Sequence, residues 1–272
     1  MNNGVVYVCY HVLQANYTSY LYVKKFVSGS WTAVGNYINA PPGTLDGCTL
    51  AFNLTGNLLL ADPYFDFGGA TTLYQLNLNS WVKTAADTLF GRHAVLATNR
   101  KTGTIYLAGH RGGFDNNNPW VPVVIDTLSG SAWKPLGAPI WNTYNAPVDF
   151  ALDPSGTPYY AHIDYPSFKV AVKKFTGSWV DVGLIGFSDG NASMVKIAFQ
   201  GSTPIVAYRD ASLAKAVVKS WNGVAWVSLG SAAVSPGDVN AISLTANSTT
   251  IWLGYDDATS GNKGTVKIRA LP

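Results

Sequence analysis

Three aspartates recur at nearly equal intervals in the second half of the chain, each at the end of a short apolar run. Asp164, Asp210 and Asp257 are 46 and 47 residues apart, and the segments that they close read PYYAHID, PIVAYRD and IWLGYDD. Carboxylates repeated in this way can bind a cation or the hydroxyls of a sugar. An Asp at a strand end also commonly accepts backbone N–H groups of its own turn. Both roles are compatible with the pattern.

Aromatic and charged residues crowd a few segments between residues 64 and 144, where they would lie on connections between strands. Flat aromatic rings stack on sugars and anchor protein partners. The same rings can instead pack a loop onto the body of the fold, so two interpretations stay open. Together with the three aspartates, the candidate ligand-binding residues are Tyr64, Phe65, Asp66, Arg111, Phe114, Asp115, Trp120, Trp141 and Tyr144.

Catalytic and metal chemistry find little support. The chain has no Glu, which excludes any mechanism that needs a glutamate acid, nucleophile or metal ligand. Its few arginines are scattered, and no nucleophile elbow, P-loop or CxxC motif occurs. His11, His110 and His162 fall at or next to one strand position in different repeats, and His93 opens another strand, so a shared metal site would need them near a common axis. We predict no catalytic residues, no metal and no cofactor.

Composition points to an all-β domain. Only 12% of the 272 residues are charged, 47% are hydrophobic and 13% are aromatic, with 27 Gly and 14 Pro. Such a chain is poor in helix formers and rich in residues that suit strands. The net charge of +3 comes from scattered basic residues, which argues against nucleic acid as a partner. No apolar run is long enough to span a membrane. Cys9 and Cys48 fit one disulfide or two buried thiols.

A repeat of about 48 residues organises the whole chain. The pattern W-x-x-x-G begins at Trp31, Trp133, Trp179 and Trp226, and Trp81 holds the same slot with Ala85 in place of Gly. A small residue recurs with the same period, at Cys9, Ala61, Ala108, Ala161, Ala207 and Gly254. These spacings indicate six copies of one unit.

Each copy contains four short runs typical of strands, here named A to D in chain order. In one copy they are 193–199, 204–209, 216–221 and 225–229. Four-stranded units repeated without helices are typical of a β-propeller. We therefore predict one all-β domain over 1–272, a six-bladed β-propeller of four-stranded antiparallel blades. The A to B and C to D turns should share one face, and the longer, variable B to C and D to A connections the other, where function usually lies.

The first and last blades are predicted to be incomplete. The chain opens on a B strand, 6–11, and stops on a C strand, 265–270, which gives six B and C strands but five A and five D strands. Six blades with imperfect closure fit this count better than a five-bladed ring with spare terminal strands.

The W-x-x-x-G strand, the Gly186-Phe187-Ser188 turn and the P-[YI]-[YV]-A-x-x-D motif resemble repeats of secreted and cell-surface β-propeller proteins, including lectin-like and kelch-like ones. The resemblance is sharp from about Trp133 onward, whereas Tyr64 and Arg111 replace the motif's Asp in the second and third copies. It implies extracellular recognition, adhesion or assembly without catalysis.

Four N-x-[ST] sequons are candidate glycosylation sites if the chain is a secreted glycoprotein. They begin at Asn16, Asn53, Asn191 and Asn247.

Two functional hypotheses follow. In the first, the protein is a non-enzymatic extracellular or cell-surface module that binds a glycan or a protein through its variable face. In the second, it is a structural protein module that self-assembles, or whose open first and last blades pair with neighbouring domains of a larger surface protein. A propeller hydrolase is a remote third possibility.

Overall fold

The computed structural model describes residues 5–15, 18–40, 47–64, 70–85, 92–111, 122–141, 143, 147–261 and 263–270. The chain divides into two compact units, Met1–Pro139 and Ile140–Pro272. Regular structure in the described residues is β-strand apart from one short 3-10 turn, Ala258–Ser260. No helix in these ranges has the length and apolar character that a membrane span requires.

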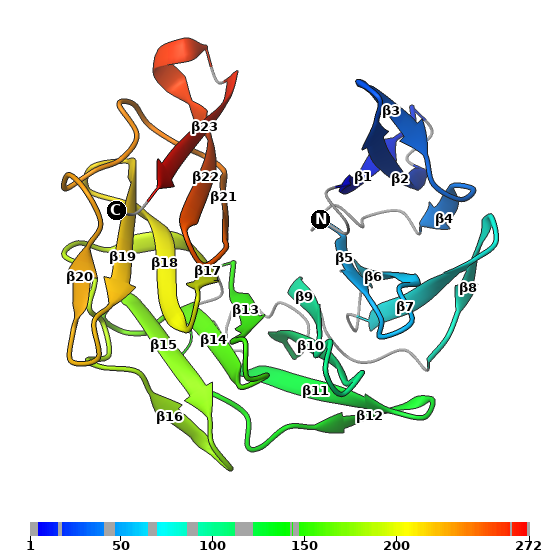
Figure 1. Ribbon diagram of the computed structural model, residues 1–272, viewed down its shortest axis with the longest axis horizontal. Coiled ribbons are helices and arrows are strands. Elements are labelled where there is room, and N and C mark those ends of the chain that lie inside the picture. The colour runs from blue at the N-terminus through cyan, green and yellow to red at the C-terminus, as the bar shows by residue number, and fades with distance from the viewer. Residues whose placement is uncertain are drawn as a thin grey trace. The chain divides into compact units, whose positions relative to one another are not determined.

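The first unit holds three antiparallel sheets, numbered here as blades one to three (Figure 1). Blade one contains β1 (Val6–Leu13), β2 (Ser19–Val27), β3 (Ser30–Ala33) and β4 (Ile38–Ala40). Blade two contains β5 (Thr49–Phe52), β6 (Leu58–Tyr64), β7 (Ala70–Asn77) and β8 (Ser80–Lys83). Blade three contains β9 (Arg92–Thr98), β10 (Ile105–His110), β11 (Val123–Ser129) and β12 (Ala132–Pro135).

The second unit holds blades four to six (Figure 1). Blade four contains β13 (Asp149–Leu152), β14 (Pro158–Ile163), β15 (Val170–Phe175) and β16 (Trp179–Asp181). Blade five contains β17 (Ala192–Gln200), β18 (Thr203–Asp210), β19 (Lys215–Trp221) and β20 (Trp226–Ser228). Blade six contains β21 (Ile242–Ala246), β22 (Thr250–Asp257) and β23 (Lys263–Ala270).

The predicted blade pattern is confirmed. Blades two to five each have four strands in the order A, B, C, D, and among the described residues blade one has no A strand and blade six no D strand. The extra strand β4 was not predicted. After β3, which pairs with residues 24–27 of β2, the chain turns at Gly35, whose φ is 71°. It then forms β4, which pairs with residues 19–21 of β2. The D strand of blade one is therefore broken into two pieces.

The W-x-x-x-G motif contributes to the contacts between blades one and two and between blades four and five. Its glycines have positive φ, and a side chain on Gly183 would collide with the Trp221 ring of the following blade. Trp226 of that blade donates from Nε1 to the carbonyl of Val182 at 2.7 Å. In the first unit, a Cβ on Gly35 would stand 2.7 Å from Nε1 of Trp81. At both boundaries a tryptophan of one blade packs where the preceding blade has a glycine, which gives a reason why the two residue types recur together.

The B strands form the buried centre of the blades. Every residue of β14 is buried, and the recurring small residues Ala61, Ala108, Ala161 and Ala207 are fully inaccessible. A small side chain is needed there because neighbouring blades pack closely on both sides. The B strand of blade one differs, since every residue of β1 is partly or largely exposed.

Two contacts attach β1 to blade two. Cys9 and Cys48 form a disulfide, and Cys48 stands directly before β5. Nε2 of His11 lies 3.1 Å from Oδ1 of Asp62, and both side chains are about 95% buried, with exposed fractions of 5% and 6%. Nδ1 of His11 lies 3.3 Å from the hydroxyl of Ser19. These links hold β1 in place across the blade boundary.

In two pairs of neighbouring A strands, a side-chain oxygen of one strand accepts a backbone N–H of the other. The hydroxyl of Thr49 in β5 accepts the N–H of Leu96 in β9 at 3.3 Å. At the same position of blade four, Oδ2 of Asp149 accepts the N–H of Ile197 in β17 at 2.8 Å. An oxygen acceptor one residue before the large apolar residue is therefore a recurrent feature of A strands.

Substituting Asp149 by Asn is expected to change how stability depends on pH. Burial raises the pKa of Asp149, and the Lys196 charge, 3.8 Å away, opposes this only in part. A raised pKa means that this carboxyl stabilises the fold below its unfolded pKa and that the contribution is lost as pH rises through the folded pKa. Asn keeps an acceptor for Ile197 without ionising. In urea unfolding from acidic to neutral pH, the stability of Asp149→Asn relative to wild type should increase with pH; a constant difference would contradict this.

Candidate functional site

The predicted variable face is formed by the strand ends from which the B to C and D to A connections emerge. Because successive strands are antiparallel, both kinds of connection leave each sheet at the same end of its strands. Six of the predicted ligand residues fall outside the described residues: Phe65, Asp66, Phe114, Asp115, Trp120 and Tyr144. Tyr64 ends β6, and its side chain also falls outside the description. The remaining candidates can be examined individually.

Asp210 and Asp257 occupy equivalent places in blades five and six, and both are buried. Oδ1 of Asp210 accepts the N–H groups of Ser212 and Leu213 at 2.9 and 3.0 Å. Oδ1 of Asp257 accepts the N–H and the hydroxyl of Thr259 at 3.0 and 2.6 Å. These carboxylates organise the turns that follow their strands, as an Asp at a strand end commonly does.

A glycine of the preceding connection closes over each of these carboxylates. A Cβ on Gly190 would lie 2.7 Å from Oδ2 of Asp210, and one on Gly237 would lie 2.9 Å from Oδ1 of Asp257. Two residues before each glycine stands a serine, Ser188 or Ser235, that accepts an N–H of the preceding blade's C strand and donates to the glycine's carbonyl. This hydrogen-bonded Ser-x-Gly motif was not predicted, although its two copies, like Asp210 and Asp257, are 47 residues apart.

The third aspartate has a different environment. Asp164 is partly exposed, and its Oδ2 accepts the hydroxyl of Ser167 at 2.6 Å. The connection that precedes blade four runs beside it, because Thr143 forms an isolated bridge with Asp164. Two residues earlier on that connection stands Trp141, whose exposed fraction of 60% is the largest of the described tryptophans. Blade four therefore presents an open indole on the connection that pairs with a polar turn.

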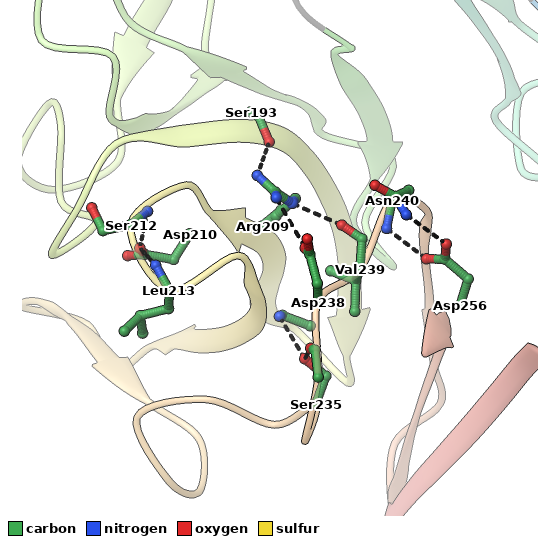
Figure 2. A network of polar contacts seen from close by, with 12 residues as sticks. Ser193, Arg209, Asp210, Ser212, Leu213, Ser235, Asp238, Val239, Asn240 and Asp256 are labelled. Carbon is green, nitrogen blue, oxygen red and sulfur yellow. Dashed lines mark hydrogen bonds and ion pairs between the residues drawn. The ribbon is translucent and has the colours of Figure 1, made fainter. Parts of the chain in front are cut away.

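An arginine network lies between blades five and six (Figure 2). Nε of Arg209 donates to the carbonyl of Val239 at 2.7 Å, and Nη2 lies 2.9 Å from Oδ1 of Asp238. Asp256 accepts the N–H groups of Asn240 and Ala241 at 2.6 and 2.7 Å, and these bonds lower its pKa. The guanidinium is thus used to fix the connection between the blades.

The connection between blades four and five is fixed by a lysine. Nζ of Lys219, a buried residue of β19, donates to the carbonyl of Phe187 at 3.3 Å and to Oδ1 of Asp189 at 3.1 Å. The Asp189 side chain is 78% exposed. Burial raises the pKa of nearby Tyr208, and the charges of Asp189 and Asp210 raise it further, so this phenol remains neutral at physiological pH.

Arg111, the candidate of blade three, is engaged by a neighbouring strand. Its Nη2 lies 2.8 Å from Oδ2 of Asp126, a buried residue of β11. The Arg111 side chain is 37% exposed, so part of the guanidinium faces solvent. Arg111 and Trp141 belong to different units.

His93 and His110 lie near each other, whereas His162 has a different neighbour. His93 and His110 have ring centroids 6.1 Å apart, and His162 stacks on Tyr160 with centroids 5.1 Å apart. Within the described ranges, no three His, Cys, Asp or Glu side chains gather in a way that could hold a metal ion.

Three of the four sequons fall in the described part of the chain. Asn53 and Asn247 lie in A to B turns, where each Oδ1 accepts bonds from its own turn. Asn191 is exposed on the connection between blades four and five, and Asn16 lies outside the described residues. Their glycosylation stays a prediction.

A hollow in the second unit opens at the ends of the strands that lie opposite the variable face. It measures about 670 Å³ and is lined by the ends of β13, β17 and β21 and by their turns, including Phe199, Leu244 and Asn247. These turns follow the A strands, so the hollow lies away from Trp141 and Asp164.

The sequence matches no protein-family model and no curated protein sequence. Solved structures share its fold. The lectin of Aleuria aurantia, described as a six-bladed β-propeller that recognises fucose, is 10% identical, with a TM-score of 0.56 over 98% of this chain and 95% of its own. The α-L-arabinanase of Penicillium chrysogenum is 11% identical, with a TM-score of 0.55 over 97% and 92%. A Hadza microbial sialidase is 14% identical, with a TM-score of 0.62 over 97% and 66%. This chain is thus a β-propeller of six blades.

Proposed function

We propose that the protein is a non-enzymatic recognition module that binds a glycan through the variable face, with blade four as the principal contact. The propeller fold serves both lectins and glycoside-cleaving enzymes, so the choice depends on individual side chains. The observation that carries the proposal is Trp141, an indole 60% exposed on the connection that pairs with Asp164.

The surroundings of Trp141 have the two properties that sugar binding needs. An exposed indole offers a flat apolar surface on which a sugar ring can stack. Asp164 and Ser167 place a carboxylate and a hydroxyl on the adjoining turn, and both are hydrogen-bonding partners for sugar hydroxyls. Tyr165 adds a second ring, which packs edge-on against Phe168 with centroids 5.2 Å apart.

The buried carboxylates argue for binding over catalysis. A glycosidase of the usual kind needs two carboxyl groups facing one substrate. Asp210 and Asp257 are occupied by their own turns, and the chain contains no Glu. Disulfides form and persist in oxidising compartments. The Cys9–Cys48 disulfide therefore supports an extracellular or cell-surface location.

Replacing Trp141 with Ala is expected to lower glycan binding at least about fivefold, because a stacked aromatic anchor contributes on the order of 1–3 kcal/mol. The measurement is glycan-array binding followed by titration of the best glycan. Trp31→Ala is the matched control, since Trp31 is also an exposed tryptophan, 46% accessible, but lies in β3 next to a C to D turn.

Unchanged binding by Trp141→Ala, or an equal loss in Trp31→Ala, would contradict the proposed site. Hydrolysis of an arrayed glycoside that disappears in Asp210→Asn while the fold persists would replace binding by catalysis as the function.

A further inference from the structure

The free edge of β1 is prepared for one more strand. Five blades have an A strand beside the B strand, whereas among the described residues β1 forms a ladder with β2 alone. The consequence is visible in burial. Val8, Cys9 and Tyr10 are partly exposed, while their counterparts in β14, Tyr160, Ala161 and His162, are buried. Alternate backbone N–H and C=O groups of β1 point to this open side.

β1 is held in position although no A strand pairs with it among the described residues. The Cys9–Cys48 disulfide and the His11–Asp62 pair hold β1 against blade two. A hollow of about 280 Å³ adjoins β1, lined by Tyr7 together with Leu50, Ala51 and Phe52 of β5. Neighbouring A strands pack side by side in this unit, as the bond between Thr49 and Leu96 shows. A strand paired with β1 would accordingly run along β5.

The other blades define the chemistry of such a strand. Opposite the residue that corresponds to Val8, the A strands always have a large apolar side chain: Leu50, Leu96, Phe150, Ile197 and Leu244. Opposite the residue that corresponds to Tyr7 they have a small one: Ala51, Ala97, Ala151, Ala198 and Thr245. One residue before the large side chain, Thr49 and Asp149 supply the acceptor for the next blade.

We propose that the β1 edge binds an extended segment of a partner polypeptide with the pattern Thr/Asp, large apolar, Ala, which adds to blade one as its A strand. Strand addition to an exposed sheet edge is an established mode of peptide recognition, in which the ladder gives affinity and alternate side chains give specificity. The Thr or Asp oxygen of the added strand would accept the backbone N–H of Leu50, as Thr49 and Asp149 do for Leu96 and Ile197. The five described A strands of a second copy of this chain are already paired in their own blades, which favours a different polypeptide as the source.

The probe is an acetylated and amidated peptide with the sequence of residues 147–155, PVDFALDPS, titrated into the full chain by calorimetry. Saturable binding is expected, and replacing the peptide's Phe by Asp should weaken it at least about tenfold. Two further peptides carry N-methyl groups on alternate residues, one set in each phase. Only one phase should abolish binding, because only one set of N–H groups enters the ladder. All changes are in the peptide, so folding of the protein is unaffected.

Hydrogen exchange supplies a second measurement. Alternate amides of β1 should exchange rapidly in the free chain and become protected by the peptide. The proposal is overturned by equal effects of both methylated peptides, by protection in the free chain of the β1 amides that point away from β2, or by a dimer that exchanges with the peptide. Trp141→Ala should bind the peptide normally, so this test is independent of the proposed glycan site.

Discussion

Replacing Gly183 with alanine is expected to destabilise the second unit by about 2–4 kcal/mol. Gly183 has a φ of 79°, a conformation that costs a residue with a Cβ on the order of 1 kcal/mol. The new methyl group would also overlap the Trp221 ring, which is packed against Trp226 and cannot move away freely. The free energy of unfolding from denaturant titration gives the measurement.

Gly177→Ala separates the two causes. Gly177 also has a positive φ, 95°, but a Cβ added there would meet no other atom within 4 Å, so only the backbone cost remains. The loss at Gly183 should therefore exceed the loss at Gly177 by at least about 1 kcal/mol. Equal losses would show that the fit between glycine and tryptophan does not join the blades.

Replacing Asp210 with alanine is expected to cost about 2–3 kcal/mol, because two N–H groups lose a charged acceptor inside a buried turn. Asp210→Asn keeps the Oδ1 acceptor and should lose less than half as much. Thermal unfolding, with glycan binding measured on the folded fraction, tests the assignment.

Asp153→Ala is the matched control for Asp210→Ala. Oδ1 of Asp153 accepts the N–H groups of Ser155 and Thr157 in an equivalent way, but in an exposed turn, so its loss should be nearer 1 kcal/mol. A folded Asp210→Ala variant that retains stability but loses glycan binding would indicate that Asp210 contacts the ligand and that its structural role is minor.

Much of the fold could be predicted because the repeat displays it several times. The period, the B and D strand motifs and the incomplete terminal blades all follow from comparing copies within one chain. The break that creates β4 occurs in one copy only, and nothing repeats to reveal it. The contacts between blades were also missed, because a motif such as Ser-x-Gly is too short to be noticed before its partner Asp210 is known to lie against it.

The site was harder to predict for the same reason. Regular spacing singled out Asp210 and Asp257, and their geometry explains that regularity by turn structure. Trp141 has no counterpart in the repeat, so its 60% exposure could be learned only from the structure. Comparison of the copies can point to the variable connections, where Trp141 was a candidate, but it does not give the exposure of a residue that has no counterpart in the other copies.

The glycine and tryptophan of the W-x-x-x-G motif belong to one short sequence but make their contacts with different neighbours. Gly183 receives a side chain from blade five, whereas Trp226 reaches back to Val182 of blade four. The boundary between blades four and five therefore combines the glycine of one copy of the motif with the tryptophan of the next copy. A change in either copy would consequently alter a boundary that both blades share.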